Sequence, residues 1–531
     1  MKTTLVLSIL AFTTSFLFAQ SGNVATSGKL ESLLYHIDHS YVDEVDEEGL
    51  VEAAIIKMLE ELDPHSVYIP KEDLQQVNEP LKGNFEGVGI QFNILKDTIF
   101  VVTTISGGPS EKLGIRAGDK IVEIDGDNVA STGIKNKDVI DRLRGKRGTK
   151  VVVGIARRHE NELLDFEITR DKIPIYSIDA AYMASPEIGY IKVNRFSATT
   201  MREFREDLSE LKEAGMKHLI LDLQGNGGGY LNTAIDMVDE FIDDNKLIVY
   251  TEGRSQPKDE TFAHRPGSFE KGKLVVLIDE GSASASEIVS GAIQDWDRGL
   301  ILGRRSFGKG LVQRPIMLPD GSAIRLTISR YYTPSGRCIQ KPYEDGIEAY
   351  HKEKYERYSK GELTDEEAIS LPDSLKFYTE NKRLVYGGGG ILPDIFVPID
   401  TSQSSTYFSK IVRKGTLNTF SLSYVDENRG ELLGTYPDVA TFKASFEVDN
   451  KLDRELIQYA KKDGIEDDED EFEKANILID ARLKALIARG LWGTSAYYEV
   501  YNEIDPVDSS YVKALSMIQD NTFERLQLAN N

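Results

Sequence analysis

Between residues 175 and 400 the sequence alternates short apolar runs with helical patterns, and this alternation limits the chain to few folds. The runs Ile188–Val193 and Leu274–Ile278 are largely apolar, which is typical of strands buried on both faces. Residues 199–214 repeat apolar side chains at helical spacing. We therefore predict an α/β layer in which helices cover a mainly buried sheet.

The same patterns predict the other elements of this layer. A buried strand at 219–223 ends in glycines. The remaining predictions are helices at 231–241 and 286–296 and strands at 300–302 and 324–328. Residues 343–385 are charged and rich in turn formers, which indicates an insertion into the layer.

The segments before and after this layer follow different patterns. Residues 28–82 carry apolar side chains at helical spacing, which predicts helices, and Pro64 and Pro70 break this pattern. From residue 85 the period changes towards two, and we expect strands at 87–90, 99–102 and 151–155. Residues 405–531 are helix-leaning, and their acidic run at 466–471 is typical of a solvated face or loop.

Residues 1–19 have the pattern of a targeting segment. Lys2 is followed by an apolar run over residues 5–18 and then by Ala19. This order predicts a secretory signal peptide, cleaved near Ala19, and therefore an exported protein that is periplasmic in a bacterium. The run is too short to cross a bilayer easily. No cysteine follows Ala19, which excludes a lipid anchor at a new N-terminal cysteine.

Composition excludes several classes of partner and site. The 531 residues suggest three or four structural units. The chain carries 63 Lys and Arg against 87 Asp and Glu, a formal charge of −24. This charge argues against nucleic acid or an anionic membrane surface as the main partner. The single cysteine excludes an intramolecular disulfide and a cysteine-based zinc site.

A glycine-rich, strand-forming unit precedes the α/β layer. Residues 118–126 read as a strand and a turn after a short helix at 110–113. With this order of elements, residues 85–170 resemble a PDZ domain, in which a peptide adds to a sheet edge and loop N–H groups bind its terminal carboxylate. The resemblance implies that this loop consists of Gly87, Val88, Gly89 and Ile90. On the residues alone, these glycines could also do no more than shape turns.

Three serines follow the apolar strand 274–278. Ser282, Ser284 and Ser286 lie where that strand ends and the next helix begins. Such a junction exposes a side chain near the N–H groups of the first helical turn, which favour negative charge. Because acyl transfer forms an oxyanion, this is a suitable place for a nucleophile. A serine alone is a weak signal, since its hydroxyl needs a base.

The candidate base is Lys309, which has a glycine on each side. Burial among Phe307, Leu311 and Val312 would disfavour the ammonium and lower its pKa, as a lysine general base requires. If this stretch is extended, Gln313 faces the same way as Lys309 and could orient the amine. A serine and a lysine in these roles form the Ser–Lys variant of the catalytic dyad.

Two strings carry a family resemblance. Residues 281–288, Gly-Ser-Ala-Ser-Ala-Ser-Glu-Ile, and 307–313, Phe-Gly-Lys-Gly-Leu-Val-Gln, resemble the carboxyl-terminal processing proteases, also called tail-specific proteases. Further matching segments lie at 62–66, 222–229, 332–337 and 389–394. The resemblance covers about residues 30–400 and selects Ser284 as the nucleophile, 25 residues before Lys309. It leaves Ser282 and Ser286 as turn or N-cap residues.

The resemblance also implies an oxyanion hole, formed by the backbone N–H of Ala285 and that of Gly228 or Gly229. Glycine lets a backbone approach a ligand closely, although a turn at a helix start would also use glycines. Gln224 stands where the family commonly has arginine, which puts in doubt any ion pair of that arginine. Cys338 stands where serine is frequent, and we interpret it as a packing residue.

Other mechanisms find little support in the sequence. None of the seven histidines lies in a nucleophile-elbow context, and we interpret His65 as a capped turn residue. Neither an H-E-x-x-H zinc motif nor a Walker A loop is present. An acyl-CoA enzyme is disfavoured by the export signal, because coenzyme A is cytoplasmic. The alternative that stays open is a non-catalytic PDZ adaptor or chaperone with a protease-like body.

The resemblance implies an α+β multidomain fold, with a crotonase-like α/β protease core, an inserted PDZ-like β-rich domain and helical N- and C-terminal regions. It implies a serine endopeptidase that binds protein substrates by their C-terminus and forms an acyl-enzyme, without cofactor or metal. A homo-oligomer and a peripheral membrane association stay open. The predicted units are a signal peptide (1–19), a helical cap (20–83), a PDZ-like domain (84–172), the protease core (173–402) and a helix-leaning C-terminal region (403–531).

Overall fold

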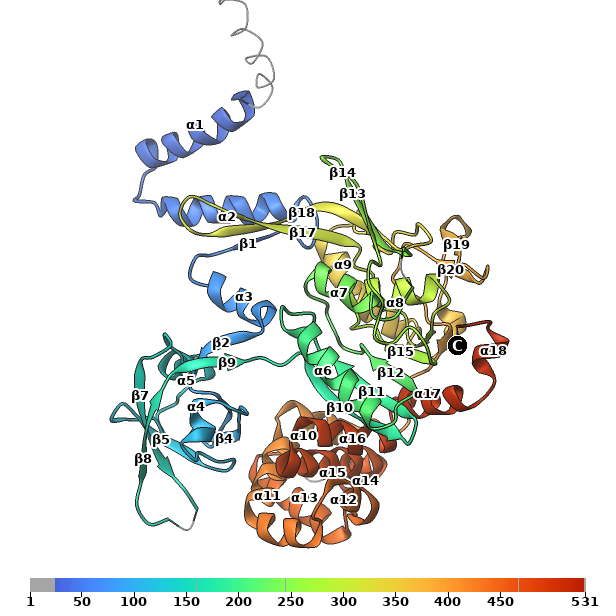
Figure 1. Ribbon diagram of the computed structural model, residues 1–531. Coiled ribbons are helices and arrows are strands. Elements are labelled where there is room, and N and C mark those ends of the chain that lie inside the picture. The colour runs from blue at the N-terminus through green and yellow to red at the C-terminus, as the bar shows by residue number, and fades with distance from the viewer. Residues whose placement is uncertain (1–23, 159, 244, 467, 530–531) are drawn as a thin grey trace, which may run out of the picture.

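The computed structural model describes residues 24–529 with the exception of residues 159, 244 and 467 (Figure 1). The predicted signal peptide, residues 1–19, lies outside the described residues. None of the described helices combines the length and the hydrophobicity that a membrane span requires.

The α/β layer is built on a six-stranded sheet with the order β10-β11-β12-β15-β16-β21. These strands are β10 (Ile178–Ser185), β11 (Ile188–Val193), β12 (His218–Asp222), β15 (Leu274–Ile278), β16 (Leu300–Gly303) and β21 (Ile395–Phe396). The first pair is antiparallel and all other pairs are parallel. The carboxyl ends of β12, β15 and β16 therefore meet at one edge of the sheet.

Helices cover both faces of this sheet. One face packs against α6 (Thr200–Glu213), α7 (Leu231–Val238) and α8 (Ala285–Asp295). The other face packs against α17 (Ser510–Gln519) and α18 (Thr522–Arg525), whose Tyr511 and Phe523 are buried. The last part of the chain, for which the sequence indicated no role, thus completes the core of the α/β layer.

A second sheet lies beside the first and is antiparallel throughout. Its order is β1-β18-β13-β14, and β17 also pairs with β18. Its strands are β1 (Val67–Ile69), β13 (Leu247–Gly253), β14 (Gln256–Phe262), β17 (Leu311–Met317) and β18 (Ala323–Tyr332). The predicted break of the helical pattern at Pro64 and Pro70 is present, and the short segment between these prolines forms β1, which pairs with β18.

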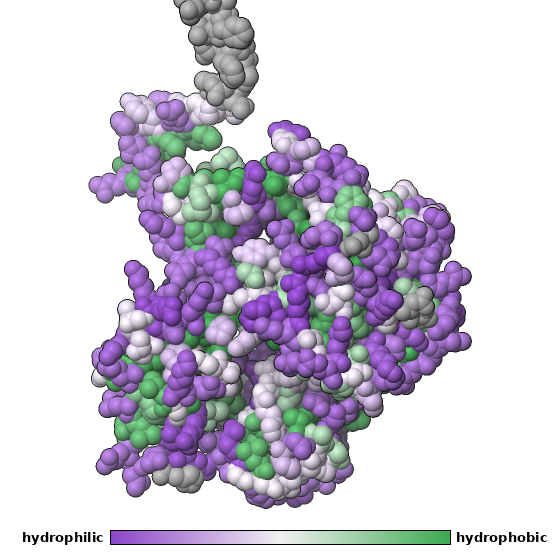
Figure 2. All heavy atoms as spheres, viewed as in Figure 1, coloured by the Kyte–Doolittle hydropathy of each residue, from purple (hydrophilic) through white to green (hydrophobic). Residues whose placement is uncertain are grey.

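The N-terminal helices are α1 (Val24–Ser40), α2 (Glu47–Glu60) and α3 (Leu74–Lys82). Their apolar periodicity predicted helices correctly. Helix α1 extends away from the rest of the molecule (Figure 1), whereas α2 packs against β1, where Tyr68 Oη donates to Glu52 Oε1 at 2.7 Å. Leu33 on α1 is 55% exposed and Met58 on α2 is 48% exposed. Apolar atoms gather on the surface over α2 and the neighbouring β17–β18 hairpin (Figure 2).

Residues 90–169 form a separate β-rich unit with its own core around Ile99, Ile121 and Val153. Its sheet has the order β3-β4-β5-β7-β8, and β6 pairs with β5. The elements are β3 (Ile90–Leu95), β4 (Thr98–Thr104), α4 (Pro109–Lys112), β5 (Lys120–Ile124), β6 (Asp127–Asn128), α5 (Asn136–Leu143), β7 (Lys150–Ala156) and β8 (Leu164–Thr169). The pair formed by β2 (Asn84–Gly87) and β9 (Asp171–Pro174) joins this unit to the remainder.

One predicted strand of this unit, residues 87–90, is wrong. Gly87 ends β2, Ile90 begins β3, and the chain turns between them. Gly89 has a φ of +77°, and a Cβ there would lie 3.0 Å from Ile173 Cδ1. Only glycine adopts this left-handed conformation readily, so the segment forms a loop instead of a strand.

The C-terminal region begins with a helical bundle around Phe420, Phe442, Leu456 and Leu483. Its helices are α10 (Thr406–Arg413), α11 (Thr416–Thr435), α12 (Val439–Ser445), α13 (Asn450–Lys462), α14 (Glu469–Lys474), α15 (Asn476–Trp492) and α16 (Thr494–Ile504). Arg489 Nη2 donates to Gln91 Oε1 at 3.2 Å, which connects the bundle to the β-rich unit.

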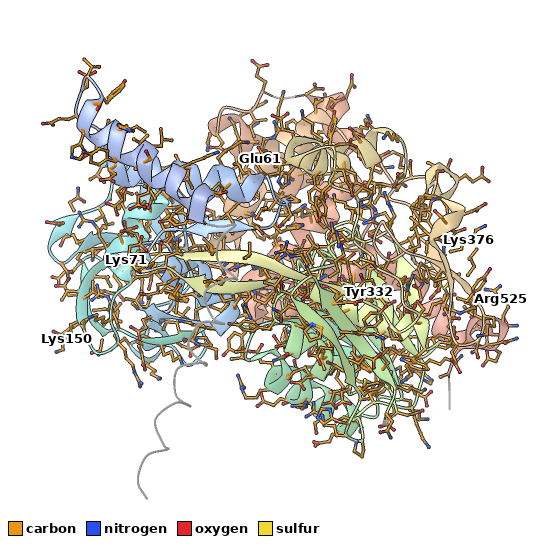
Figure 3. All side chains as sticks on the ribbon, turned by 90° about the horizontal axis from the view of Figure 1, so that it is seen from above. Glu61, Lys71, Lys150, Tyr332, Lys376 and Arg525 are labelled. Atoms are coloured by element: carbon orange, nitrogen blue, oxygen red, sulfur yellow. The ribbon has the colours of Figure 1, made fainter. Side chains whose placement is uncertain are left out.

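Charged side chains cover the surface on all sides of the ribbon in Figure 3, where Lys150 of the β-rich unit and Arg525 of α18 lie at opposite ends. Part of the acidic run 466–471 has a local structural role. Asp468 is the N-cap of α14 and accepts a hydrogen bond from the Glu471 N–H at 3.2 Å.

The predicted insertion, residues 343–385, is more ordered than its composition suggested. It contains α9 (Ile347–Ser359), the 3₁₀ helices Glu366–Ala368 and Asp373–Leu375, and the hairpin of β19 (Lys376–Tyr378) and β20 (Leu384–Tyr386). Tyr350 and Arg357 on α9 are buried. The insertion is therefore packed against the α/β layer and does not extend from it.

Candidate active site

The three loops that follow β12, β15 and β16 meet at one edge of the central sheet. They carry Gly228 and Gly229, Ser284, and Lys309 in that order. In open α/β sheets this edge, at the carboxyl ends of parallel strands, is the usual position of a ligand site. The topology thus brings together residues that are up to 81 positions apart in the sequence.

These loops border a cleft of about 920 Å³. All the residues that the sequence proposed for the dyad and the oxyanion hole line it: Ser284, Lys309, Gln313, Ala285, Gly228 and Gly229. Tyr230, Leu231 and Ile288 contribute apolar surface to the same cleft. A cleft with apolar walls and a few convergent polar groups is the common form of a binding site.

Ser284 is held in a strained backbone conformation. Its φ is +56° and its ψ is −110°, immediately before the first residue of α8. A non-glycine residue in such a region costs of order 1–3 kcal/mol and persists only where its surroundings fix it. The sharp turn between β15 and α8 therefore exposes the Ser284 side chain in the cleft.

Two glycines lie directly against this turn. A Cβ on Gly228 would come within 2.8 Å of Ser284 Cβ, and one on Gly229 within 2.0 Å of the Phe196 oxygen. The Gly228 N–H donates to Asn226 Oδ1 at 2.8 Å. Within the described residues, the N–H groups of Gly229 and Ala285 have no acceptor. These two are therefore the donors available to a developing oxyanion.

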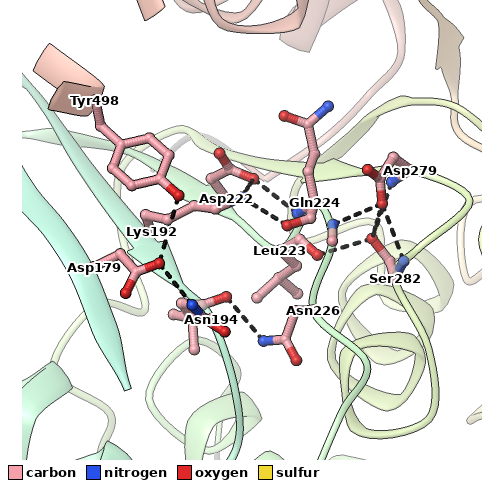
Figure 4. A network of polar contacts seen from close by, with 12 residues as sticks. Asp179, Lys192, Asn194, Asp222, Leu223, Gln224, Asn226, Asp279, Ser282 and Tyr498 are labelled. Carbon is pink, nitrogen blue, oxygen red and sulfur yellow. Dashed lines mark hydrogen bonds and ion pairs between the residues drawn. The ribbon is translucent and has the colours of Figure 1, made fainter. Parts of the chain in front are cut away.

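A polar network fixes the loop that contains these glycines (Figure 4). Asp222 Oδ1 accepts from Lys192 Nζ at 2.9 Å and from the Gln224 N–H at 2.8 Å. Ser282 Oγ donates to the Leu223 oxygen at 2.8 Å. The side chains that hold the loop come from β11 (Lys192), from the end of β12 (Asp222) and from the segment after β15 (Ser282). The N–H groups of the loop are therefore fixed in position before substrate binds.

Gln224 has a partner from the far end of the chain. Its Nε2 donates to Asp508 Oδ2 at 3.0 Å, and Arg304 Nη1 donates to the same oxygen at 2.7 Å. Arg304 also pairs with Glu280 at 3.0 Å. Gln224, at the position where the family commonly has arginine, thus donates a hydrogen bond from its uncharged amide to Asp508. The positive charge beside it belongs to Arg304, which donates to the same carboxylate.

Lys309 has a pKa below its ordinary value. Burial is the main cause, and the positive charge of Arg325 adds to it, while Glu287 and Asp63 oppose the shift. This direction is the one that a lysine general base requires. Within the part of the chain that the structure describes, no hydrogen bond joins Lys309 Nζ to Ser284 Oγ. Such bonds often form only in the complex with substrate.

The sequence analysis missed Glu287, a buried carboxylate that connects the two loops. Its Oε2 accepts from the Ser284 N–H at 2.8 Å and from the Lys309 N–H at 2.9 Å. Its Oε1 accepts from the Gly308 N–H at 2.7 Å and from Ser306 Oγ at 2.5 Å. Burial raises the pKa of Glu287 and these four donors oppose that shift. The Ser-x-x-Glu spacing of a capping box was the available signal.

Tyr331 connects the same two residues through their carbonyl groups. Its buried hydroxyl lies 2.7 Å from the Lys309 oxygen and 3.1 Å from the Ser284 oxygen. Glu287 and Tyr331 together therefore fix the peptide groups of Ser284 and Lys309 relative to each other. No sequence signal pointed to Tyr331, because its position depends on the pairing of β18.

We expect Glu287→Gln to lower kcat/KM by about 10²-fold. The NH₂ group of glutamine is a donor and cannot accept the hydrogen bonds that the backbone N–H groups around Ser284 and Lys309 donate to Glu287, so the two residues lose their fixed positions. The same change lowers the free energy of unfolding by about 2–4 kcal/mol. Peptide hydrolysis and chemical denaturation measure the two effects. Ser290→Ala, on the same buried face of α8, is the control, since Ser290 Oγ donates only to the Ser286 oxygen. Equal effects of both substitutions would contradict the role given to Glu287.

The interpretation of Ser286 needs correction, and that of Gln313 stays untested. Ser286 is not an N-cap: it is the second residue of α8, and its Oγ donates to the Asn226 oxygen at 2.9 Å. The N-cap is Ser284 itself. Gln313 Nε2 donates to Thr327 Oγ1 at 3.3 Å, and within the described residues it has no hydrogen bond to Lys309. Gln313 lines the cleft, but its predicted orienting role stays a prediction.

His65 is a turn residue, as predicted, and its ring also lies near the candidate site. Its N–H donates to Asp63 Oδ1 at 2.8 Å, as expected for a capped turn. Its ring Nε2 lies 2.7 Å from Tyr350 Oη on α9. Burial, with the positive charge of Lys309 next, lowers the pKa of His65 to about 4. The histidine is therefore neutral at ordinary pH and part of the wall behind Lys309.

The insertion supports the Lys309 loop. Arg357 Nη2 donates to the Arg305 oxygen at 2.6 Å, and Arg357 Nη1 donates to the Ser306 oxygen at 3.0 Å. Arg305 in turn pairs with Glu362 at 2.7 Å. A segment that the sequence left without a role thus fixes the backbone that leads to the candidate base.

The predicted peptide-binding loop lies at the free edge of the β-rich unit. Within the described residues, the N–H groups of Val88 and Gly89 have no acceptor. The Val88 oxygen accepts from Ser110 Oγ at 2.6 Å, which holds the loop on α4. Strand β3 is at the edge of its sheet, so a peptide could add beside it.

Comparison with family models assigns most of the chain. The model of peptidase family S41 matches residues 187–349 and a PDZ domain model matches residues 100–157, as the sequence predicted. The model of the N-terminal domain of the activating protease CtpB matches residues 17–73. A family of unknown function matches residues 407–493 in the helical bundle.

Individual proteins are similar over longer stretches. The carboxy-terminal processing protease CtpB of Bacillus subtilis is 30% identical over 407 residues, which cover 76% of this chain and 80% of the relative. The carboxy-terminal-processing protease of Bartonella bacilliformis is 38% identical over 56% of this chain and 69% of its own. The solved photosystem II D1 C-terminal processing protease is 30% identical, over 58% of this chain and 89% of that one, with a TM-score of 0.34.

Proposed function

Because the chain belongs to the carboxyl-terminal processing proteases of peptidase family S41, we propose that it is an exported endopeptidase that uses Ser284 and Lys309 as its catalytic dyad. Family membership makes it a serine-type peptidase with a PDZ domain in an α+β multidomain fold. The observation that carries the proposed dyad is that both side chains line one cleft while Glu287 and Tyr331 join their backbones.

The reaction proceeds in two steps. Neutral Lys309 takes the proton of Ser284 as its Oγ attacks the scissile carbonyl carbon. The N–H groups of Ala285 and Gly229 stabilise the resulting oxyanion. Lys309 then gives the proton to the leaving amine, and the acyl-enzyme forms. In the second step Lys309 takes a proton from a water molecule as the water oxygen attacks the acyl carbon. Lys309 then gives this proton to Ser284 Oγ as the ester bond breaks, which releases the product acid and restores both residues. No metal or cofactor takes part.

The PDZ domain binds the C-terminus of the substrate. The free N–H groups of Val88 and Gly89 bind the terminal carboxylate of a protein, and its last residues extend along β3. Gly87 and Ile90 are the first and last residues of this loop. The part of the substrate chain that precedes these last residues then reaches the cleft that contains Ser284. Substrates are proteins or peptides with an extended, accessible C-terminal segment.

The place of action is outside the cytoplasm. Lys2, the apolar residues 5–18 and Ala19 support export through a cleaved signal peptide, to the periplasm in a bacterium. The exposed apolar side chains of α1 and α2 are compatible with a homo-oligomer or with a peripheral membrane association. Export is tested by N-terminal sequencing of the protein from a periplasmic extract, which should begin near residue 20.

We expect kcat/KM to rise with pH. A general base acts only when it is unprotonated, so activity is lost as pH falls below the pKa of Lys309, about tenfold per pH unit. Because burial lowers that pKa, the midpoint lies below the ordinary lysine value of 10.5. Hydrolysis of a peptide that has an apolar C-terminus and no titrating group in this range measures the profile. A non-catalytic adaptor gives no turnover at any pH, and a midpoint at or above 10.5 would exclude Lys309 as the base.

A further inference from the structure

The active-site cleft is lined by the basic side chains Lys309, Arg314 and Arg325, and no aspartate or glutamate is among the described lining residues. Arg314 and Arg325 stay charged when Lys309 is the neutral base. The chain as a whole carries 87 Asp and Glu against 63 Lys and Arg. A basic cleft in an acidic protein concentrates positive potential at one place and favours a negatively charged group of the substrate.

Arg325 has the position from which it can reach such a group. On β18 it pairs with Pro315 of β17, just as Thr327 pairs with Gln313. Directly opposite residues of an antiparallel pair share a face, so Arg325 and Gln313 lie on the same side of the hairpin. The Arg325 side chain is half-buried, which strengthens its electrostatic interactions compared with a fully exposed arginine.

The guanidinium of Arg325 has no partner of its own. Among the described residues it forms no ion pair and no side-chain hydrogen bond. Two arginines near the site that are more deeply buried are paired, Arg304 with Asp508 at 2.7 Å and Arg305 with Glu362 at 2.7 Å. A guanidinium has five donors in a planar fork that matches a carboxylate, so an unpaired one in a cleft is available to a ligand.

The two carboxylates that act on Lys309 already have hydrogen-bond partners. Glu287 lies buried behind the cleft wall and accepts four hydrogen bonds. Asp63 Oδ1 accepts from the N–H groups of His65 and Ser66 at 2.8 and 2.9 Å and from Thr327 Oγ1 at 3.1 Å. Neither group lines the cleft. Since no carboxylate is among the described residues that line the cleft, a negative charge that pairs with Arg325 there would come from the substrate.

We propose that Arg325 forms a subsite for a carboxylate of the substrate beside the scissile bond. The carboxylate is either the side chain of an acidic residue or the terminal carboxylate of a short substrate. Arg314, exposed at the rim of the same cleft, adds to the attraction. This inference rests on the proposed function and adds to it a preference for acidic substrates that the PDZ domain does not provide.

Charge-selective hydrolysis tests the subsite. Two series of peptides are used: one with glutamate or glutamine at each position around the cleaved bond, and one with a free or amidated C-terminus. For the wild type we expect kcat/KM to be about 10–100-fold higher for the carboxylate member of one series, the magnitude of a charge-assisted hydrogen bond. Arg325→Gln reduces this ratio to near one, and Arg325→Lys restores part of it. The series that shows the loss identifies the source of the carboxylate.

A pH profile separates this role from a merely structural one. The charged groups that face Lys309 are Arg325 on β18, Glu287 on α8 and Asp63 in the segment before β1, and the neutral, titratable His65 lies in the same segment. Since Arg325 lowers the pKa of Lys309, its loss moves the rising limb of kcat/KM to higher pH. A folding defect would lower activity without moving the limb. Arg330→Gln, on the same strand but outside the cleft, is the control and should change neither ratio nor limb.

The outcomes distinguish the two levels of inference. If no variant and no peptide shows hydrolysis that depends on Ser284, the proposed function fails and the subsite fails with it. If the wild type cleaves but Arg325→Gln keeps the full carboxylate preference, or if no preference exists, the subsite alone is overturned. Loss of the preference in Arg325→Gln with a retained glutamine-peptide rate supports it.

Discussion

Ser284→Ala lowers kcat/KM for peptide hydrolysis by at least about 10⁴-fold, the effect of removing the nucleophile from a serine peptidase. The oxyanion donors at Ala285 and Gly229 remain, so any residual rate comes from them and from substrate binding alone. The fold is retained, because Ser284 Oγ has no structural hydrogen bond within the described residues. Initial rates with a peptide of apolar C-terminus, together with a thermal melting curve, measure both expectations.

The two neighbouring serines are matched controls for this substitution. Ser286→Ala removes one hydrogen bond to the Asn226 oxygen. Ser282→Ala removes one to the Leu223 oxygen and the two contacts of its Oγ with Asp279. Each lost hydrogen bond costs about 0.5–1.5 kcal/mol of stability, and both variants keep activity within about tenfold of the wild type. If activity survived in Ser284→Ala but were lost in one of these controls, the nucleophile would be the serine changed in that control and not Ser284.

Lys309→Arg is expected to abolish activity to a similar degree, by at least about 10⁴-fold. Arginine keeps the positive charge and the length of the side chain, but it does not lose its proton at any working pH. The backbone contacts of Lys309 to Glu287 and Tyr331 do not involve the side chain, so the folded state is retained. Stopped assays over long incubation times, from pH 6 to pH 10, determine the residual rate.

A second variant shows whether charge or proton transfer matters. Lys309→Met has similar length and no charge, and it should be as inactive as the arginine variant because neither can accept a proton. If Lys309→Met were inactive and Lys309→Arg kept more than about one hundredth of the activity, the side chain would act through its positive charge. That result would contradict its role as a general base.

The sequence predicted those parts of the fold that depend on local pattern. Ile188–Val193 and Leu274–Ile278 are strands, and the glycines after residue 223 do form a loop at the sheet edge. Strand β1 was missed because three residues between prolines carry little periodicity and pair with β18, more than 250 positions away. The role of α17 was missed for the same reason, since only the folded sheet shows what Tyr511 and Phe523 cover.

The sequence predicted the candidate catalytic residues of the site but not the residues that surround and position them. A strand-to-helix junction with serines and a lysine between glycines indicated a Ser–Lys dyad, and the family resemblance selected Ser284 among the three serines. Glu287 was visible only as a possible cap, and its contact with the Lys309 N–H depends on how two loops meet. Arg325 and Tyr331 on β18 gave no signal, because a strand pattern does not show which residues face a cleft.

Covalent trapping with peptide mapping tests most directly whether Lys309 activates Ser284. Wild type and Lys309→Arg are treated with a peptidyl phosphonate, a serine-directed reagent, under conditions in which the wild type hydrolyses peptide, and the adduct is located by mass spectrometry. We predict one adduct, on Ser284, whose rate of formation rises with pH at the same midpoint as kcat/KM and which is absent from Lys309→Arg. An adduct on Ser282 or Ser286, or labelling of Lys309→Arg at the wild-type rate, would contradict the Ser284–Lys309 dyad.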